Sequence, residues 1–245
     1  MTQSLSAKVL AELEQLSDPA KVAVFQRFFK TSPGQYGEGD QFLGLAVPIQ
    51  RHLAKRYQQQ ATLADCAELL ASPWHEARLV ALMLLIGSYA ATPSEPERAA
   101  IIDLYQASFD RINKWDLVDL SAPKLTGPWY LGRDRGPLFD WARSDHLWTR
   151  RIAVLSSFAF IRAGDASTTL ELADILLRDR HDLMQKAVGW MLREVGNRQG
   201  SVEREWLAAP APGGAIPRFK LMGRTMLRYA IEKFPAEEYQ RWLKG

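Results

Sequence analysis

The chain has 245 residues, of which 47% are hydrophobic and 24% charged, as expected for a globular protein rather than a disordered or fibrous one. It contains no run of about 18 apolar residues and does not open with a basic and then apolar export segment, so we expect a soluble cytoplasmic protein without a membrane span. Cys66 is the only cysteine, which excludes a disulfide framework and a cysteine-rich metal site. We expect it to be a small buried residue.

The charge is modest overall and uneven along the chain. The formal net charge is +3, but residues 1–100 carry 9 basic and 10 acidic side chains, whereas residues 101–245 carry 22 and 18. Arginine makes up 21 of the 31 basic residues, and its planar guanidinium suits phosphate. The second half of the chain therefore hints at an anionic partner.

Helical periodicity runs through the whole sequence. A first helix spans residues 5–16, and the turn at Asp18-Pro19 starts a second that carries phenylalanines to residue 29. Further helices are predicted to start at Val47-Pro48, after Thr62, after Ser72-Pro73 and at Pro96. The glycine-rich stretch 32–40 lacks the lysine of a phosphate-binding loop, so it is either a structural loop or a substrate-facing one. No segment shows the alternation of a strand, and we predict an all-α protein.

Basic residues recur at the starts of successive helices with a spacing of 35–38 residues, at Arg78, Lys114, Arg151, Lys186 and Arg224. A period of this size is typical of stacked helical hairpins of the HEAT, armadillo or tetratricopeptide kind. The expected architecture is thus an α-solenoid whose leading basic residues line one concave surface. The break at residues 208–214 is too short for a free linker, so we expect a single domain over residues 1–245.

Three helices carry candidate binding residues. In the helix 182–197, Trp190 lies among Lys186, Arg193 and Asn197 rather than in the apolar stripe, so it either packs between helices or meets a flat or cationic ligand, with Gly189 leaving space beside it. Arg151 lies at the edge of its helix, as an ion-pair partner or a phosphate clamp. Within residues 215–234, Lys220, Arg224 and Arg228 form a ladder at steps of four, which is either a solvated face or a nucleic-acid contact.

The segment Lys114-Trp115-Asp116-Leu117-Val118-Asp119 carries the candidate chemistry. In a helix, Trp115 and Asp119 project from one face, which places an indole beside a carboxylate in a partly desolvated position. Asn113 is a plausible helix cap with Asp116 at the third helical position, which explains one acid but not Asp119. The four histidines lie in separate segments without ligand spacing, so we read them as solvent-exposed or capping residues and expect no metal.

Three segments together resemble the AlkD-like DNA alkylation repair glycosylases, and the similarity covers nearly the whole chain. They are Asn113 to Asp119, Trp148 to Leu155 and Gln185 to Glu194. The resemblance implies a curved stack of HEAT-like helical pairs that binds duplex DNA and excises N3- or N7-alkylated purines without extruding the base. We expect a monomer that requires no cofactor.

The resemblance also implies roles for individual residues. Asp119, Trp115 and Trp190 would contact the deoxyribose of the lesion, and Arg151 would hold the backbone nearby. The residues expected to contact DNA phosphates are Lys114, Arg150, Lys186, Arg193, Lys220, Arg224 and Arg228. One position departs from the family pattern, because Leu43-Gly44-Leu45 is followed by Ala46 where the family has a glutamine in its cleft.

Two alternatives belong to other functional classes. A non-catalytic HEAT-repeat protein could use the same groove to bind damaged or branched DNA, as some relatives with altered clefts do. A scaffold for a protein partner is disfavoured, because the repeated positions are basic rather than apolar.

Overall fold

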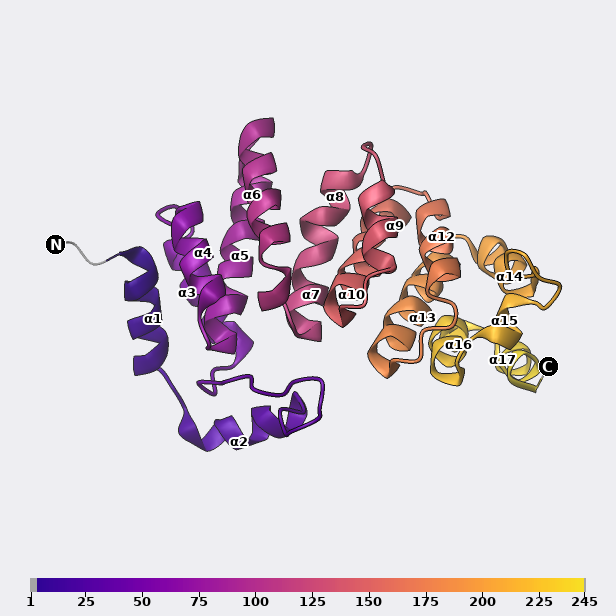
Figure 1. Cartoon of the computed structure of the whole chain (residues 1–245), viewed down its shortest axis with the longest axis horizontal. Coiled ribbons are helices and arrows are strands. Elements are labelled where there is room, and N and C mark those ends of the chain that lie inside the picture. Colours follow the sequence, from indigo (N-terminus) through magenta and orange to yellow (C-terminus); the bar gives the residue numbers. More distant parts are fainter. Residues whose placement is uncertain (1–3, 245) are drawn as a thin grey trace. The chain divides into compact units, whose positions relative to one another are not determined.

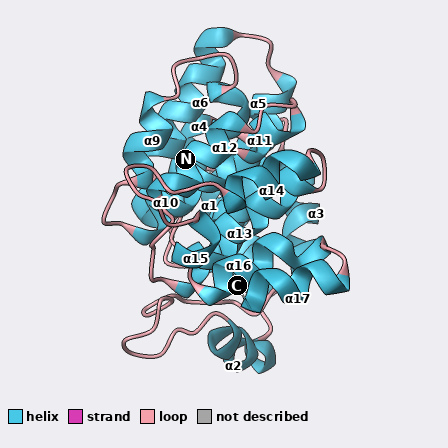
Figure 2. Cartoon of the chain, turned by 90° about the vertical axis from the view of Figure 1, so that its right-hand side faces the viewer, coloured by secondary structure: helices cyan, strands magenta, loops and turns pink. Residues whose placement is uncertain are grey.

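Residues 4–244, which are the residues that the computed structural model describes, form helices joined by loops and contain no β-strand (Figures 1 and 2). The all-α prediction is confirmed. Within that range, no helix is long and apolar enough to cross a bilayer. By their internal contacts the helices divide into two compact units, with the division between Ser121 and Ala122.

The first unit is built around one nearly buried helix. Its elements are α1 (Leu5–Gln15), α2 (Pro19–Phe28), α3 (Val47–Tyr57), α4 (Leu63–Ala71), α5 (His75–Ala91), α6 (Glu95–Ala107), η1 (Phe109–Arg111) and α7 (Trp115–Ser121). Helix α5 packs against α3, α4, α6 and α7, and its Leu82, Leu84 and Leu85 are fully buried. Each such side chain stabilises the fold by about 1.5–3 kcal/mol. In contrast, none of the residues Pro19–Phe28 of α2 is buried.

Local signals set the helix starts of this unit as predicted. The Asp18 side chain accepts a hydrogen bond from the backbone of Ala20 and is followed by Pro19, whose fixed φ suits a first helical position. Thr62 and Asp65 form a reciprocal capping box at the start of α4. Cys66 lies buried in the same helix, as expected.

The second unit has α13 at its centre. Its elements are η2 (Ala122–Lys124), α8 (Thr126–Tyr130), α9 (Gly136–Ala142), α10 (Leu147–Ser156), α11 (Phe158–Arg162), α12 (Ser167–Ile175), α13 (Asp182–Gly196), α14 (Gly200–Ala208), α15 (Arg218–Leu221), α16 (Arg224–Ala230), η3 (Ile231–Lys233) and α17 (Ala236–Lys244). The predicted apolar stripe of α13 is confirmed, since Met184, Val188, Met191, Leu192 and Val195 are fully buried.

Two expectations for this unit are wrong. A Cβ atom on Gly189 would lie 2.4 Å from the carbonyl oxygen of Met226, so this glycine lets α16 approach α13 and does not leave space for a ligand. The basic ladder does not lie on one helix, because α15 ends at Leu221 and α16 begins at Arg224. Lys220 is therefore separated from Arg224 and Arg228 by a break in the helix.

Candidate active site

Helix α7 places Trp115 and Asp119 one turn apart. Leu117, Val118 and Ser121 form the buried side of this short helix, whereas Trp115 and Asp119 are both partly exposed. Complete burial raises the pKa of the Tyr105 phenol, and the negative charge of Asp119 raises it further. The i, i+4 arrangement of indole and carboxylate expected from the sequence is thus present in the helix.

A buried ionic network fixes the start of this helix. The His75 ring lies between two carboxylates, with Nε2 2.8 Å from Oδ2 of Asp116 and Nδ1 3.1 Å from Oδ2 of Asp40. Asp40 also pairs with Arg78 and with Lys114, whose Nζ is 3.3 Å away. The side chains of His75, Asp40 and Arg78 are only 2–3% exposed, and buried charges are costly unless they are paired. The pairs therefore hold α5, the loop before α3 and α7 together.

The pKa values of the network reflect this mutual pairing. Burial by itself would lower the pKa of His75, but the charges and hydrogen bonds of Asp116 and Asp40 outweigh it and raise the pKa to about 9. Burial by itself would raise the pKa of Asp40, but His75, Arg78 and Lys114 outweigh it and lower the pKa to about 2. His75 is therefore an imidazolium at neutral pH.

Aromatic rings hold Trp115 from the side of α2. Its ring stacks on Phe29 at 5.5 Å between centroids and an interplanar angle of 23°, and it meets the edge of Phe28 at 5.7 Å. Phe29 and Phe42 in turn lie 5.0 and 4.8 Å from the ring of His75. The same imidazolium thus contacts the aromatic cluster and the carboxylate of α7.

The turn before α3 is fixed by a second buried carboxylate. Glu76, fully buried on α5, accepts hydrogen bonds of 2.9–3.1 Å from the backbone amides of Leu43, Gly44 and Leu45. Gly44 has φ +82°, a conformation that other residues rarely adopt. Ala46, which follows Leu45, is the exposed residue before α3.

In the second unit, Trp190 is half-buried on α13. Its indole Nε1 donates to Oε1 of Glu194 at 3.3 Å, one turn further along. Lys186 forms an ion pair of 2.7 Å with Asp182, and Arg193 pairs with Glu232. These polar side chains lie off the apolar stripe, as predicted.

The adjacent arginines of α10 have different partners. Nε of Arg150 lies 2.9 Å from Oδ2 of Asp179, in an ion pair. Arg151 is only 5% exposed, and its Nη1 donates to the carbonyl oxygen of Leu183 at 2.5 Å. Arg151 therefore ties α10 to the first turn of α13.

Comparisons with known proteins identify the family of the chain. A sequence model described as DNA alkylation repair enzyme matches residues 9–234. The chain belongs to the DNA alkylation repair enzyme family. A solved structure described as a predicted DNA alkylation repair enzyme from Enterococcus faecalis is 18% identical and has a TM-score of 0.69, covering 90% of this chain and 97% of that one. That likeness shows the fold. No functionally curated protein matches the sequence.

The predicted stripe of exposed basic residues is wrong for three of its five members. The five repeating residues do lie within or next to the starts of helices, but Arg78, Lys114 and Arg151 are 2%, 1% and 5% exposed. Lys186 is partly exposed, and Arg224 is exposed, with its Nη1 2.7 Å from the carbonyl oxygen of Leu243. Only some members of the repeat therefore reach the surface, because buried carboxylates and carbonyl groups take the others.

Several residues of the network were missed or misread in the sequence. His75 is a buried ion-pair partner rather than a solvent-exposed or capping residue, whereas His181 does cap α13. Asp116 pairs with His75, and Asn113 accepts from Arg78 instead of capping α7. The glycine-rich loop delivers Asp40 to this network, which favours its structural role. Among residues 4–244, no cluster of three His, Cys, Asp or Glu side chains is arranged for a metal ion.

Proposed function

We propose that the protein is a monofunctional DNA glycosylase that hydrolyses the N-glycosidic bond of cationic N3- or N7-alkylated purines in duplex DNA. The observation that carries the proposal is the pair of Trp115 and Asp119 on α7, in a chain of the alkylation repair family. The buried contacts of Asp116, Lys114 and Trp115 restrain the first turn of that helix, so the pair has a preorganised support.

The chemistry needs a stabilised positive charge on the sugar. Alkylation at N3 or N7 makes the purine a cation and a good leaving group, so cleavage develops oxocarbenium character on the deoxyribose, as in glycoside hydrolysis. A carboxylate about 4 Å from that charge, at an effective dielectric constant near 20, contributes on the order of 4 kcal/mol, roughly a thousandfold in rate. In this proposal Asp119 supplies that charge and Trp115 packs its ring against the sugar.

Duplex binding would come from the basic side chains of the second unit. Arg224, Arg228 and Lys220 are exposed, and Lys186 is partly exposed. Arg150 and Arg193 are engaged in ion pairs that phosphates would have to replace. By the family resemblance, the proposal also assigns Trp190 to the deoxyribose and Arg151 to the DNA backbone beside it. Because Arg151 is only 5% exposed, its guanidinium would have to leave the carbonyl oxygen of Leu183 to reach a phosphate. Lys114 is proposed instead as a structural cation, since its ammonium is buried against Asp40.

The direct test is incubation of the protein with methylated duplex DNA, followed by chromatography of the released bases. Release of 7-methylguanine or 3-methyladenine that depends on enzyme concentration supports the proposal. Gel shifts at two salt concentrations accompany it, because affinity from phosphate contacts falls steeply with salt.

A second candidate function is suggested by Ala46. It is exposed at the start of α3, where the family pattern has a cleft glutamine. Salt-dependent duplex binding without base release would favour a non-catalytic DNA-binding protein. Absence of any salt-dependent shift would contradict both functions and favour a protein scaffold.

A further inference from the structure

The segment that leads into α7 is held from outside at four consecutive positions. The pairs are Asn113 with Arg78, Lys114 with Asp40, Trp115 with Phe29, and Asp116 with His75. The three polar pairs have distances of 2.8–3.3 Å, and Trp115 stacks on its partner ring. Because a helix of 7 residues has little stability by itself, these contacts determine how its first turn is oriented.

The partners of this segment converge on His75. Its Nδ1 lies 3.1 Å from Oδ2 of Asp40, and Arg78 pairs with the same carboxylate. The ring of Phe29, at the end of α2, lies 5.0 Å from the imidazole ring. The other ring nitrogen of His75 contacts Asp116 directly. His75 is therefore the residue through which α5, the loop before α3 and the end of α2 act on α7.

The charge on His75 decides whether both of its carboxylate partners receive a strong hydrogen bond. An imidazolium has two N–H groups, whereas a neutral imidazole has one. In the neutral form one carboxylate would face a ring nitrogen with a lone pair, and the bond to the other would no longer be charge-assisted. Asp40 has Arg78 as a further partner, but Oδ1 of Asp116 has no hydrogen-bond partner among residues 4–244. Asp116 therefore depends on His75.

The neighbours of His75 in the described part of the chain favour its charged form. They comprise two cations and three anions, so the charges balance when the ring is an imidazolium. These neighbours are Arg78 and Glu76 of α5, Lys114 and Asp116 at the start of α7, and Asp40 of the loop before α3. Burial lowers the pKa of His75, but Asp116 and Asp40 outweigh this effect and raise the pKa to about 9.

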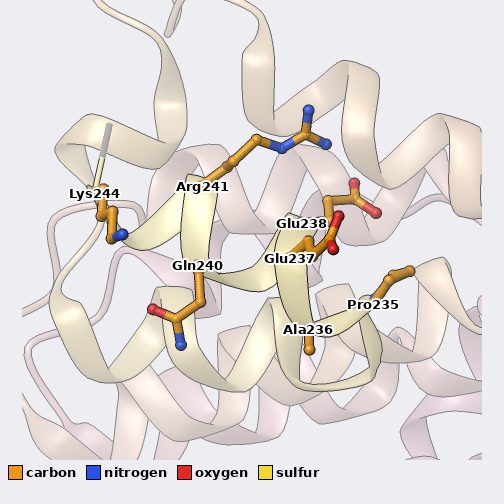
Figure 3. A pocket seen from close by; sticks show the side chains of 7 residues that line it. All are labelled: Pro235, Ala236, Glu237, Glu238, Gln240, Arg241 and Lys244. Atoms are coloured by element: carbon orange, nitrogen blue, oxygen red, sulfur yellow. The ribbon is translucent and has the colours of Figure 1, made fainter.

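An ion pair in the second unit lacks this arrangement. Glu238 lines a hollow beside α17 (Figure 3), and Arg204 binds it through hydrogen bonds of 2.6 and 2.8 Å. The side chain of Arg204 is 38% exposed, and exposed ion pairs contribute little to stability. Loss of this pair should leave the fold intact, so it provides a control for the loss of the buried pair of His75 and Asp116.

We infer that His75 is a positioning residue of the candidate active site, whose imidazolium holds Asp116 and so orients Trp115 and Asp119, and that base release requires this ring to be charged. Trp115 precedes Asp116 by one residue and Asp119 follows it by three, so a shift of the first turn moves both side chains. A misplacement of about 1 Å can lower a rate roughly a hundredfold. The inference rests on the proposed function for its link to base release, whereas the contacts alone support the control of α7.

The first test follows the indole N–H resonance of Trp115 by NMR in the intact protein without DNA, from pH 6 to 10. The variant Trp115→Phe identifies the resonance. We expect it to shift as His75 ionises, at a pKa of about 9. In Asp116→Asn the midpoint should move to lower pH, because one of the two carboxylates that favour the imidazolium is lost. A resonance that does not shift in the wild type, or shifts equally in His75→Gln, would overturn the inference.

The second test measures single-turnover base release from methylated duplex DNA, with duplex binding followed by gel shift. At pH 7, His75→Gln should release bases about ten- to a hundredfold more slowly and bind the duplex normally. Asp116→Asn should fall further behind the wild type as the pH rises from 7 to 9, because its His75 loses the charge at lower pH. The ratio of the two rates cancels any titration of the substrate. Glu238→Gln should keep the wild-type rate throughout.

Opposite results would contradict the positioning role. They are a wild-type rate in folded His75→Gln, a weaker duplex affinity that accounts for its whole loss of rate, and a constant ratio of Asp116→Asn to the wild type across this pH range. If His75→Gln does not fold, Asp116→Asn decides by itself.

Failure of the positioning role is separable from failure of the proposed function. A wild type that releases bases, with variants that release them equally fast, refutes the positioning role and leaves the glycosylase intact. A wild type that releases none refutes the proposed catalysis, and the titration of Trp115 then decides whether His75 controls α7.

Discussion

The imidazolium of His75 lies 2.8 Å from the carboxylate of Asp116 and joins the first turn of α5 to the first turn of α7. Asp116 stands between Trp115 and Asp119 in the sequence, so the contact restrains the turn that carries both candidate residues. The buried charged residues around His75 therefore restrain the first turn of α7, while Asp119 on the next turn is partly exposed.

Replacing Asp119 by asparagine should keep the fold and duplex binding but lower the release of 7-methylguanine at least about a hundredfold, because a developing sugar cation loses its counter-charge. Single-turnover release from methylated duplex DNA measures the rate, and a gel shift measures binding. Asp103→Asn, at an exposed position of α6, is the control and should release bases at the normal rate. Equal rates for the two variants would remove Asp119 from the mechanism.

The stability of the protein should fall as the pH rises through the folded-state pKa of His75. Because this pKa is raised from 6.5 to about 9, the contribution of the imidazolium is fully present below pH 6.5 and is lost as the pH passes about 9. The difference is on the order of 3 kcal/mol. Denaturant unfolding from pH 6 to 10 should show this decline in the wild type and in His52→Gln, which changes an exposed histidine, but not in His75→Gln. Parallel curves for all three proteins would contradict the network.

Glu203 on α14 should make the stability of the protein depend on pH in a second range, which begins at a lower pH than that of His75. Burial raises its pKa to about 8, and the charge of Arg204 only partly offsets this. Glu203 ionises near pH 4.5 in the unfolded chain but keeps its proton in the folded protein. The free energy of unfolding therefore falls progressively as the pH rises from 4.5 to 8. Glu203→Gln should flatten that part of the curve of unfolding free energy against pH. Glu205→Gln, at an exposed position of the same helix, should keep the wild-type slope, and a loss of slope there would argue against Glu203 as its source.

A methyl group at Gly189 should separate α13 from α16. Its Cβ would lie 2.4 Å from the carbonyl oxygen of Met226 and 2.5 Å from Cβ of Tyr229, atoms that cannot rotate away. Gly189→Ala should therefore lower the free energy of unfolding by about 1–3 kcal/mol. At Gly214 a Cβ would meet nothing nearer than the carbonyl oxygen of Ala211 at 3.7 Å, so Gly214→Ala should be close to neutral. Equal melting temperatures for the two variants would show that the helices can shift.

The residue pattern along the chain was sufficient for the helical class and for much of the local structure. The starts of α2 and α4 at Asp18 and Thr62, the apolar stripe of α13 and the i, i+4 relation of Trp115 and Asp119 all follow from interactions within one or two helical turns. Such short-range rules are legible in the sequence, because the residues that interact are also neighbours in the chain.

Only the tertiary structure decided which charged side chains are available. His75 pairs with Asp40 and Asp116 across separations of 35 and 41 residues, and these partners turn His75, Arg78 and Lys114 from expected surface groups into buried ones. The sequence shows a basic residue at the start of each repeat but not the carboxylate that meets it. Because the cost of burying a charge depends on that distant partner, packing alone distinguishes a structural cation from one that can reach a phosphate.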